Sequence, residues 1–306
     1  GGQWQEVAMS DQGDNRYSAS IPGQPLKTVV EYYLTAETDD GNHSSVPAGA
    51  EELENYHQFG IWEPASQTLD LTFEEGSGTP VDHSAYDHEV RVVGNVEYME
   101  SPLEGSEYAL YLDGDSTYLE VESENAFFLT SPYFTLDFWF VINDSILPAG
   151  GTRLIIKENV SPWWDINYQV RLTGSGALQP DARLEGIGSI RGDLAMDSTL
   201  SVDTWYHLIF TVGEDSAFAQ LRGQDDQLIQ ETGVGIPAGD RALLASGPFR
   251  IGAFTNAFGR NDRYIKGKFD NVKVFNYVPP EYKTGLLEET APVIPEEVTL
   301  YRNYPN

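Results

Sequence analysis

A pair of adjacent tryptophans is the first feature of this sequence that could do chemistry. The stretch SPWWDINY contains Trp163, Trp164, Asp165 and Tyr168, and it lies between two strand-like runs. Aromatic rings stack on the apolar faces of sugar rings, and a polar neighbour can orient the sugar. The stretch therefore predicts a loop that contacts a glycan or a protein partner. The alternative is that one tryptophan enters the core while the other covers a sheet edge.

A second candidate loop is NAFGRNDRY, residues 256–264, with Arg260, Asp262 and Arg263 as the side chains that could contact a ligand. A third stretch, VDHSAYDH, places His83 and His88 beside two aspartates. Its spacing matches no established zinc signature, so we expect a turn there and no zinc site.

The composition limits the partners of this chain. Its 306 residues include 18 basic and 48 acidic side chains, which gives a net charge of −30. Such a chain repels nucleic acid and anionic lipid, and it favours hard cations such as calcium, although the charge could serve solubility alone. The chain has no cysteine, which excludes disulfides and thiolate catalysis. No apolar run approaches the ~20 residues of a membrane span, so membrane insertion is not expected.

Short apolar runs separated by Gly, Asn, Asp and Pro predict an all-β chain in several pieces. Residues 1–63 contain strand-like runs such as TVVEYYLTAET, and 64–67 look like a linker. Residues 68–280 carry many further strand-like runs with no sustained helical period, which fits one large double-sheet jelly roll. Residues 281–297 form a Pro- and Glu-rich linker, and 298–306 begin as a strand.

Five motifs in residues 68–280 carry a family resemblance. They are LTFEEGSGTPVDHS, ALYLDGDSTYLEV, FTLDFWFVI, TWYHLIFTV and GKFDNVKVFNYV, in this order. Together they resemble the laminin-G-like, concanavalin A-like jelly roll of bacterial surface proteins and carbohydrate-binding modules. The resemblance implies a two-sheet sandwich.

This resemblance also implies a structural calcium ion. In the family, calcium often bridges the loop after the first strand and the closing strand. The matching positions here are Glu74, Glu75, Asp113 and Asp270, with the carbonyl of Gly114 as a further oxygen ligand. The alternative is that these acids cap strands and turns.

Two further resemblances concern the ends of the chain. Ile21 to Pro25 and Val30 to Ala36 resemble the C-terminal half of an immunoglobulin or fibronectin-III-like module, so residues 1–63 are expected to be an incomplete β-sandwich. Leu300 and Asn303 to Asn306 resemble the first strand of a C-terminal sorting domain of type IX secretion in Bacteroidota-like bacteria. They imply a secreted or cell-surface protein whose sequence begins inside one module and stops inside another.

Hydrolysis is a natural question, because laminarinase-type glycoside hydrolases share the jelly-roll fold. Those enzymes carry Glu-x-Asp-x-x-Glu on one strand. The only Glu-x-Asp here is Glu37-Thr38-Asp39, outside the predicted jelly roll, and position 42 is asparagine. His207 lies in a strongly β run and is expected to be packed, and no Gly-x-Ser-x-Gly is present. We expect a protein that is not an enzyme.

Two functions remain open at this point. The first is a structural or adhesive protein of the cell surface that binds copies of itself or a neighbouring module. Its terminal strand, with Val298, Leu300, Tyr301 and Tyr304, would be donated head to tail into a filament. The second is a calcium-stabilised, polysaccharide-binding module of a larger secreted enzyme.

Overall fold

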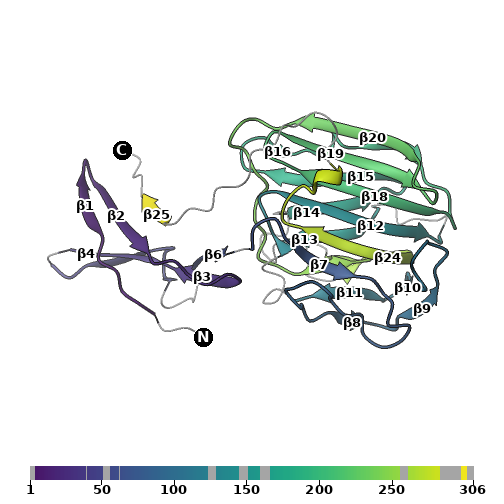
Figure 1. The fold of residues 1–306 in the computed structure, drawn as a ribbon. Helices are drawn as coiled ribbons and strands as arrows, with labels where there is room; N and C mark the ends of the chain where they lie inside the picture. The colour runs from purple at the N-terminus through teal and green to yellow at the C-terminus, as the bar shows by residue number, and fades with distance from the viewer. Residues whose placement is uncertain are drawn as a thin grey trace. The chain divides into compact units, whose positions relative to one another are not determined.

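The computed structural model describes residues 4–38, 40–50, 56–61, 63–122, 129–144, 151–158, 166–255, 261–282 and 298–301. The chain divides into two compact units, Gly1–Pro64 with Glu288–Asn306, and Ala65–Leu287 (Figure 1). Regular structure in the described residues is almost entirely β, as the sequence predicts, with one 3-10 turn, η2 (Pro280–Tyr282).

The larger unit is a sandwich of two antiparallel sheets. The sheet that we call the β12 sheet has the strand order β20-β19-β18-β12-β24-β10-β9, with β7 also paired to β24. Its strands are β7 (Gln67–Leu71), β9 (Glu97–Glu100), β10 (Tyr108–Asp113), β12 (Phe134–Ile142), β18 (Trp205–Val212), β19 (Ser216–Gly223), β20 (Leu228–Gly235) and β24 (Lys266–Phe275).

The second layer, the β13 sheet, has the order β16-β15-β14-β13-β21-β11-β8, with β17 also paired to β15. Its strands are β8 (Arg91–Val93), β11 (Tyr118–Val121), β13 (Thr152–Glu158), β14 (Ile166–Leu172), β15 (Ala177–Leu184), β16 (Gly188–Ser189), β17 (Met196–Thr199) and β21 (Phe249–Ile251). A short hairpin, β22 (Phe254–Thr255) with β23 (Asn261–Asp262), follows β21.

The hydrophobic core lies between the two sheets and follows the period of two along each strand. In β12 the residues Phe134, Leu136, Phe138 and Phe140 all face the core and are fully buried. Successive side chains of a strand point to opposite faces, so the residues between them face outward from the sandwich. The inward side chains pack the two sheets together as the jelly roll that the sequence predicts. Each sheet also has an outer face that is available to contact other molecules.

The smaller unit has short ladders and little buried surface. Its described strands are β1 (Ser10–Gly13), β2 (Arg16–Ile21), β3 (Thr28–Tyr32), β4 (Leu34–Glu37), β5 (His43–Val46), β6 (His57–Ile61) and β25 (Val298–Tyr301). They form three separate ladders, β1-β2-β25, β3-β6 and β4-β5. The immunoglobulin-like assignment therefore stays a prediction.

Two local features of the smaller unit are the break in its longest strand-like run and the pairing of the terminal strand. The run TVVEYYLTAET breaks at Tyr33 into β3 and β4. The ring of Tyr33 packs against Trp4 at 5.2 Å and against Tyr56 at 5.7 Å, so aromatic contacts replace the strand ladder at this residue. The terminal strand β25 pairs antiparallel with β2, and Ser18 lies opposite Tyr301.

Candidate functional site

Of the carboxylates predicted to bind calcium, Glu74 and Asp270 lie beside the same hydroxyl group. The hydroxyl of Ser106 lies 2.7 Å from Oε1 of Glu74 and 2.8 Å from Oδ2 of Asp270. The same hydroxyl is 3.0 Å from the carbonyl oxygen of Tyr108. Because a hydroxyl has only one proton, it satisfies one of these three acceptors at a time. Other donors complete the cluster, because the backbone N–H of Glu107 donates to Glu74, and Ser101 and Asn271 donate to Asp270.

Asp270 reaches this position through an irregularity in β24. Asn271 has a positive φ of 48°, and the pairing of β24 with β12 shifts register at this point. As a result Phe269 and Val272 both face the core, while the carboxylate of Asp270 meets Ser101 and Ser106. Burial raises the pKa of Asp270 to about 6, although hydrogen bonds from the two serines oppose the rise.

The other predicted calcium ligands lie elsewhere. Asp113 pairs with Lys266, four residues along β24 from Asp270, or about 13 Å at the rise of a strand. Its carboxylate caps the following turn by accepting from the backbone N–H groups of residues 115, 116 and 117. Gly114 has φ of 81°, and a Cβ there would lie 2.6 Å from Cβ of Lys266. Glu75 accepts instead from the backbone N–H of Val81 at 2.9 Å.

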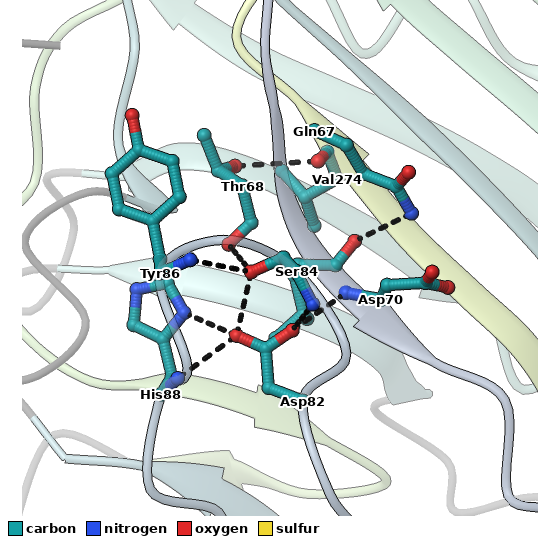
Figure 2. A network of polar contacts seen from close by, with 9 residues as sticks. Gln67, Thr68, Asp70, Asp82, Ser84, Tyr86, His88 and Val274 are labelled. Carbon is teal, nitrogen blue, oxygen red and sulfur yellow. Dashed lines mark hydrogen bonds and ion pairs between the residues drawn. The ribbon is translucent and has the colours of Figure 1, made fainter. Parts of the chain in front are cut away.

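The stretch with two histidines is a loop held by one aspartate (Figure 2). Asp82 accepts from the backbone N–H groups of Asp70, Ser84 and His88, from the hydroxyl of Ser84, and from Nδ1 of His88 at 2.7 Å. Burial alone would raise the pKa of Asp82, but these hydrogen bonds outweigh it and lower the pKa. In the part of the chain that the structure describes, no three His, Asp or Glu side chains are grouped to hold a metal.

The predicted tryptophan loop is described only in part. Trp163, Trp164 and Asp165 lie outside the described residues. Tyr168 is fully buried in the core, and its hydroxyl donates to the carbonyl of Leu129 at 2.7 Å. The prediction that Tyr168 contacts a ligand is therefore corrected. Its position in β14 gives it the inward direction of that strand, and the aromatic-rich sequence does not reveal this.

In the second predicted loop, the surroundings of one predicted side chain, Arg263, are described. Arg260 lies outside the described residues, and Asp262 is the last residue of β23. The guanidinium of Arg263 lies 5.3 Å from the ring centre of Phe254. The guanidinium of Arg153 lies over the same ring at 4.5 Å. Both arginines make cation–π contacts with Phe254, so Arg263 joins the outer face of the β13 sheet.

That outer face carries a chain of buried polar side chains. Nε of Arg153 donates to the side-chain oxygen of Gln169, and the amide of Gln169 donates to Asp181 at 2.8 Å. The other oxygen of Asp181 accepts from the hydroxyl of Ser189 at 2.6 Å. Arg153, Gln169 and Asp181 are each less than 10 % exposed. We name this set, which crosses β13, β14, β15 and β16, the polar row.

The sequence contains a signal for the polar row that the motif search misses. Polar and apolar residues alternate in INYQVRL and ALQPDARL, so Gln169, Arg171, Gln179, Asp181 and Arg183 share one face of two paired strands. Farther along the same sheet, Glu120 pairs with both Arg91 and Arg250, and Arg250 also binds Glu158 at 3.0 Å.

The outer face of the β12 sheet is closed by the chain itself. His207 lies between Asp137 at 2.7 Å and Asp226 at 3.0 Å, and it stacks on Trp139 at 4.4 Å. The hydroxyl of Tyr282, from η2, donates to Asp137. These side chains hold each other, and η2 contributes Tyr282 to the cluster.

Comparison with known families agrees with this architecture. The sequence pattern of the concanavalin A-like lectin/glucanases superfamily of laminin G type matches residues 113–281, which is more than half of the chain. The chain belongs to this family. The matched residues of the concanavalin A-like domain include β12, β13, β14, β15 and β24, which form the centres of both sheets.

Solved structures similar to this concanavalin A-like protein are distant. The binding domain of botulinum neurotoxin DC in complex with rat synaptotagmin II is 15 % identical, with a TM-score of 0.46, over 69 % of this chain and 48 % of that one. The binding domain of botulinum neurotoxin serotype D is 15 % identical, with a TM-score of 0.48, over 69 % and 48 %. The chain thus spans about half the length of these structures, and the likeness carries no functional argument. No curated protein matches the sequence.

Proposed function

We propose that this concanavalin A-like domain is a non-catalytic carbohydrate-binding domain that acts outside the cell. The observation that supports it best is the polar row on the outer face of the β13 sheet. Burying Arg153, Gln169 and Asp181 there costs free energy that an apolar surface would not. Their mutual hydrogen bonds hold this part of the face in place, so the partly exposed side chains beside them, Arg171 and Gln179, would be the groups that meet a ligand.

The carboxylates of this face are poorly placed for acid–base catalysis. Both oxygens of Asp181 accept hydrogen bonds, from Gln169 and Ser189. Glu120 pairs with two arginines, and Glu158 pairs with Arg250. Glycoside hydrolysis needs one carboxylic acid and one carboxylate on either side of the scissile bond. Burial raises the pKa of Asp70 and of Asp270, but both lie on the other sheet, and Asp270 is fully buried.

The extracellular location rests on the family resemblances at the sequence level. Laminin-G-like jelly rolls and the sorting-type strand both belong to secreted proteins. In the described residues, no helix is long and apolar enough to cross a membrane.

A bound cation would suit the cluster of Glu74 and Asp270. Two carboxylates, the hydroxyls of Ser101 and Ser106 and the carbonyl of Tyr108 offer the oxygen ligands that calcium prefers. Calcium would neutralise the two carboxylates and connect the loop after β7 to the closing strand β24. Its role would be structural, because Asp270 is not exposed to solvent.

Glycan binding is tested by titrating a panel of neutral and acidic polysaccharides into the whole chain and measuring heat. The variant Gln179→Ala removes a partly exposed amide of the binding face, and Gln24→Ala, in the smaller unit, is the matched control. We expect binding of at least one polysaccharide that Gln179→Ala weakens and Gln24→Ala leaves unchanged. If no polysaccharide binds at millimolar concentration, the proposal is wrong.

Strand donation is a second candidate, favoured by the pairing of β25 with β2. The register Ser18 with Tyr301 through Ile21 with Val298 adds β25 beside β2 within one chain. The same ladder formed between two chains would link copies head to tail. Light scattering on the full chain and on a chain ending at residue 297 tests this. Rods or oligomers that form only with β25 support a filament, whereas monomers in both cases exclude it.

A further inference from the structure

The β12 sheet ends at a long edge strand. β20 pairs with β19 on one side, and no described strand pairs with its other side (Figure 1). Just after β20, the backbone N–H of Ile236 donates to the carbonyl of Asp215 at 2.6 Å. Because an antiparallel ladder bonds every second residue, the backbone N–H and C=O groups that point to the open edge belong to Glu231, Gly233 and Gly235.

This edge is exposed to solvent. Gly233 and Gly235 are both exposed, and a glycine consists of backbone alone, so the exposed atoms are those of the strand itself. A Cβ added at Gly233 would meet only Ala217 and Phe218, which both belong to β19. Glycine within a strand is typical of places where another backbone approaches closely. The free side of β20 thus has room for a further strand.

The opposite edge of the same sheet is protected by charge, whereas β20 is not. Two of the four residues of β9, Glu97 and Glu100, are exposed glutamates, and charges on an edge strand oppose pairing with another chain. β20 has one charged residue in eight, Glu231, and no lysine or proline. In a chain with a net charge of −30, two copies can approach each other most easily at such a strand.

We propose that β20 pairs antiparallel with β20 of a second copy of this chain, which joins the two β12 sheets into one. A two-fold axis at Thr232 makes the ladder self-complementary. It places Glu231 opposite Gly233 of the second copy and brings Ile229 beside Gly235, so each larger outward side chain covers a glycine. The side chain of Ile229 is 49 % exposed in the single chain, so the dimer would bury apolar surface.

The charge and the composition of β20 select this register. Shifting the pairing by two residues in one direction would place Glu231 opposite Glu231 of the second copy, and like charges directly opposite each other repel. Shifting it in the other direction would bring Pro237, which has no N–H to donate, into the ladder. Only the register centred on Thr232 avoids both costs.

The proposed dimer has a consequence for binding. A two-fold axis perpendicular to the joined sheet keeps equivalent faces on the same side, so the two polar rows would face the same way. A polysaccharide that spans both would bind with higher avidity than it does to one copy. The dimer itself goes beyond the proposed carbohydrate function and does not depend on it, since it rests on the edge of β20 alone.

Sedimentation velocity of the whole chain, from micromolar to hundred-micromolar concentrations, tests the dimer. We expect a reversible monomer–dimer equilibrium in which added sodium chloride favours the dimer, because salt screens the net charge of −30. The dimer should persist in a chain that ends at residue 297, which separates it from the pairing of β25 with β2. A monomer at every concentration and salt level overturns the proposal.

A matched pair of variants locates the interface. Gly233→Pro removes an N–H that points to the open edge and leaves the bonds to β19 in place, so it should weaken the dimer about tenfold or more. Gly233→Ala adds a Cβ at the same position but keeps the N–H, so it should leave the dimer essentially unchanged. Equal dimerisation of the two variants would exclude β20 as the interface.

The register is tested with single cysteines, because the chain has none of its own. Thr232→Cys puts two thiols opposite each other on the axis, where Cα atoms about 4.5 Å apart suit a disulfide. Leu228→Cys is the control. Leu228 is 54 % exposed, but in this register it lies on the order of 27 Å from its own copy. Mild oxidation should cross-link Thr232→Cys and leave Leu228→Cys monomeric on a denaturing gel. Equal cross-linking of both, or none at Thr232→Cys, contradicts the proposed pairing.

Discussion

Glu74 and Asp270, from opposite ends of the jelly-roll sequence, share the hydroxyl of Ser106, at 2.7 and 2.8 Å. The hydroxyl also lies near the carbonyl of Tyr108, while the backbone N–H of Glu107 donates to Glu74 and Ser101 donates to Asp270. Burial raises the pKa of Asp270 to about 6, so either a proton or a cation would neutralise this buried carboxylate. The two alternatives predict different dependences on pH and calcium.

If a proton satisfies the cluster, stability should fall as the pH rises. The pKa of Asp270 is raised from 3.8 to about 6, so its contribution is complete below pH 3.8 and is lost as the pH rises through 6. In EDTA, Asp270→Asn should therefore be more stable than the wild type at pH 8, by on the order of 2 kcal/mol, but not at pH 4. Urea unfolding at both pH values measures this.

Asp113→Asn is the control, because the pKa of Asp113 is lowered and its contribution to stability therefore has the opposite dependence on pH. Hydrogen bonds from the turn that follows β10 lower the pKa of Asp113 despite partial burial. Its contribution is present at neutral pH and is lost as the pH falls through the lowered pKa. The variant should thus be destabilised at pH 7. A stabilising effect of Asp270→Asn at both pH values would contradict the proton alternative.

If calcium satisfies the cluster, one millimolar calcium should raise the melting temperature of the EDTA-treated protein. Glu74→Gln and Asp270→Asn should abolish the rise, because each removes a charged oxygen ligand. Glu75→Gln should retain it, since Glu75 is bound to the backbone of Val81. Differential scanning fluorimetry decides the question, and equal calcium shifts in all four proteins would exclude this site.

The loop in Figure 2 should depend on one carboxylate. Asp82→Ala leaves the buried N–H donors of Asp70, Ser84 and His88 without their acceptor, so we expect a loss of about 3 kcal/mol in the free energy of unfolding. His83→Ala should change it by less than about 0.5 kcal/mol, because half of the His83 side chain is exposed. Comparable losses in both variants would show that the loop is not held by Asp82.

Tyr168 should matter for stability and leave binding unchanged. Tyr168→Phe removes the hydrogen bond to Leu129 and keeps the ring in the core, which we expect to cost about 1 kcal/mol. Polysaccharide affinity, measured by calorimetry, should be equal to that of the wild type. A selective loss of affinity at unchanged stability would restore Tyr168 as a ligand contact.

The all-β jelly roll follows from local sequence, because strand formation and burial depend on nearby residues. FTLDFWFVI alternates Phe134, Leu136, Phe138 and Phe140 with other side chains, and that period of two is sufficient to predict a strand with a buried face. The matched family confirms the architecture that the ordered motifs predict.

The sites depend on contacts between distant segments, which no local pattern specifies. The calcium prediction grouped five residues, but the register of β10 with β24 separates Asp113 from Asp270 and leaves Glu74 beside Ser106. The polar row escaped prediction for the same reason. Arg153, Gln169 and Asp181 meet only when β14 pairs with both β13 and β15.

The sequence by itself therefore determined the strands, the buried faces and the acidic charge, since each is a property of composition or of a period of two. The tertiary structure alone decided which carboxylates lie close together and which polar side chains form the polar row. Electrostatic interactions act through space over a few ångströms, and only strand register and loop packing bring these groups within that range.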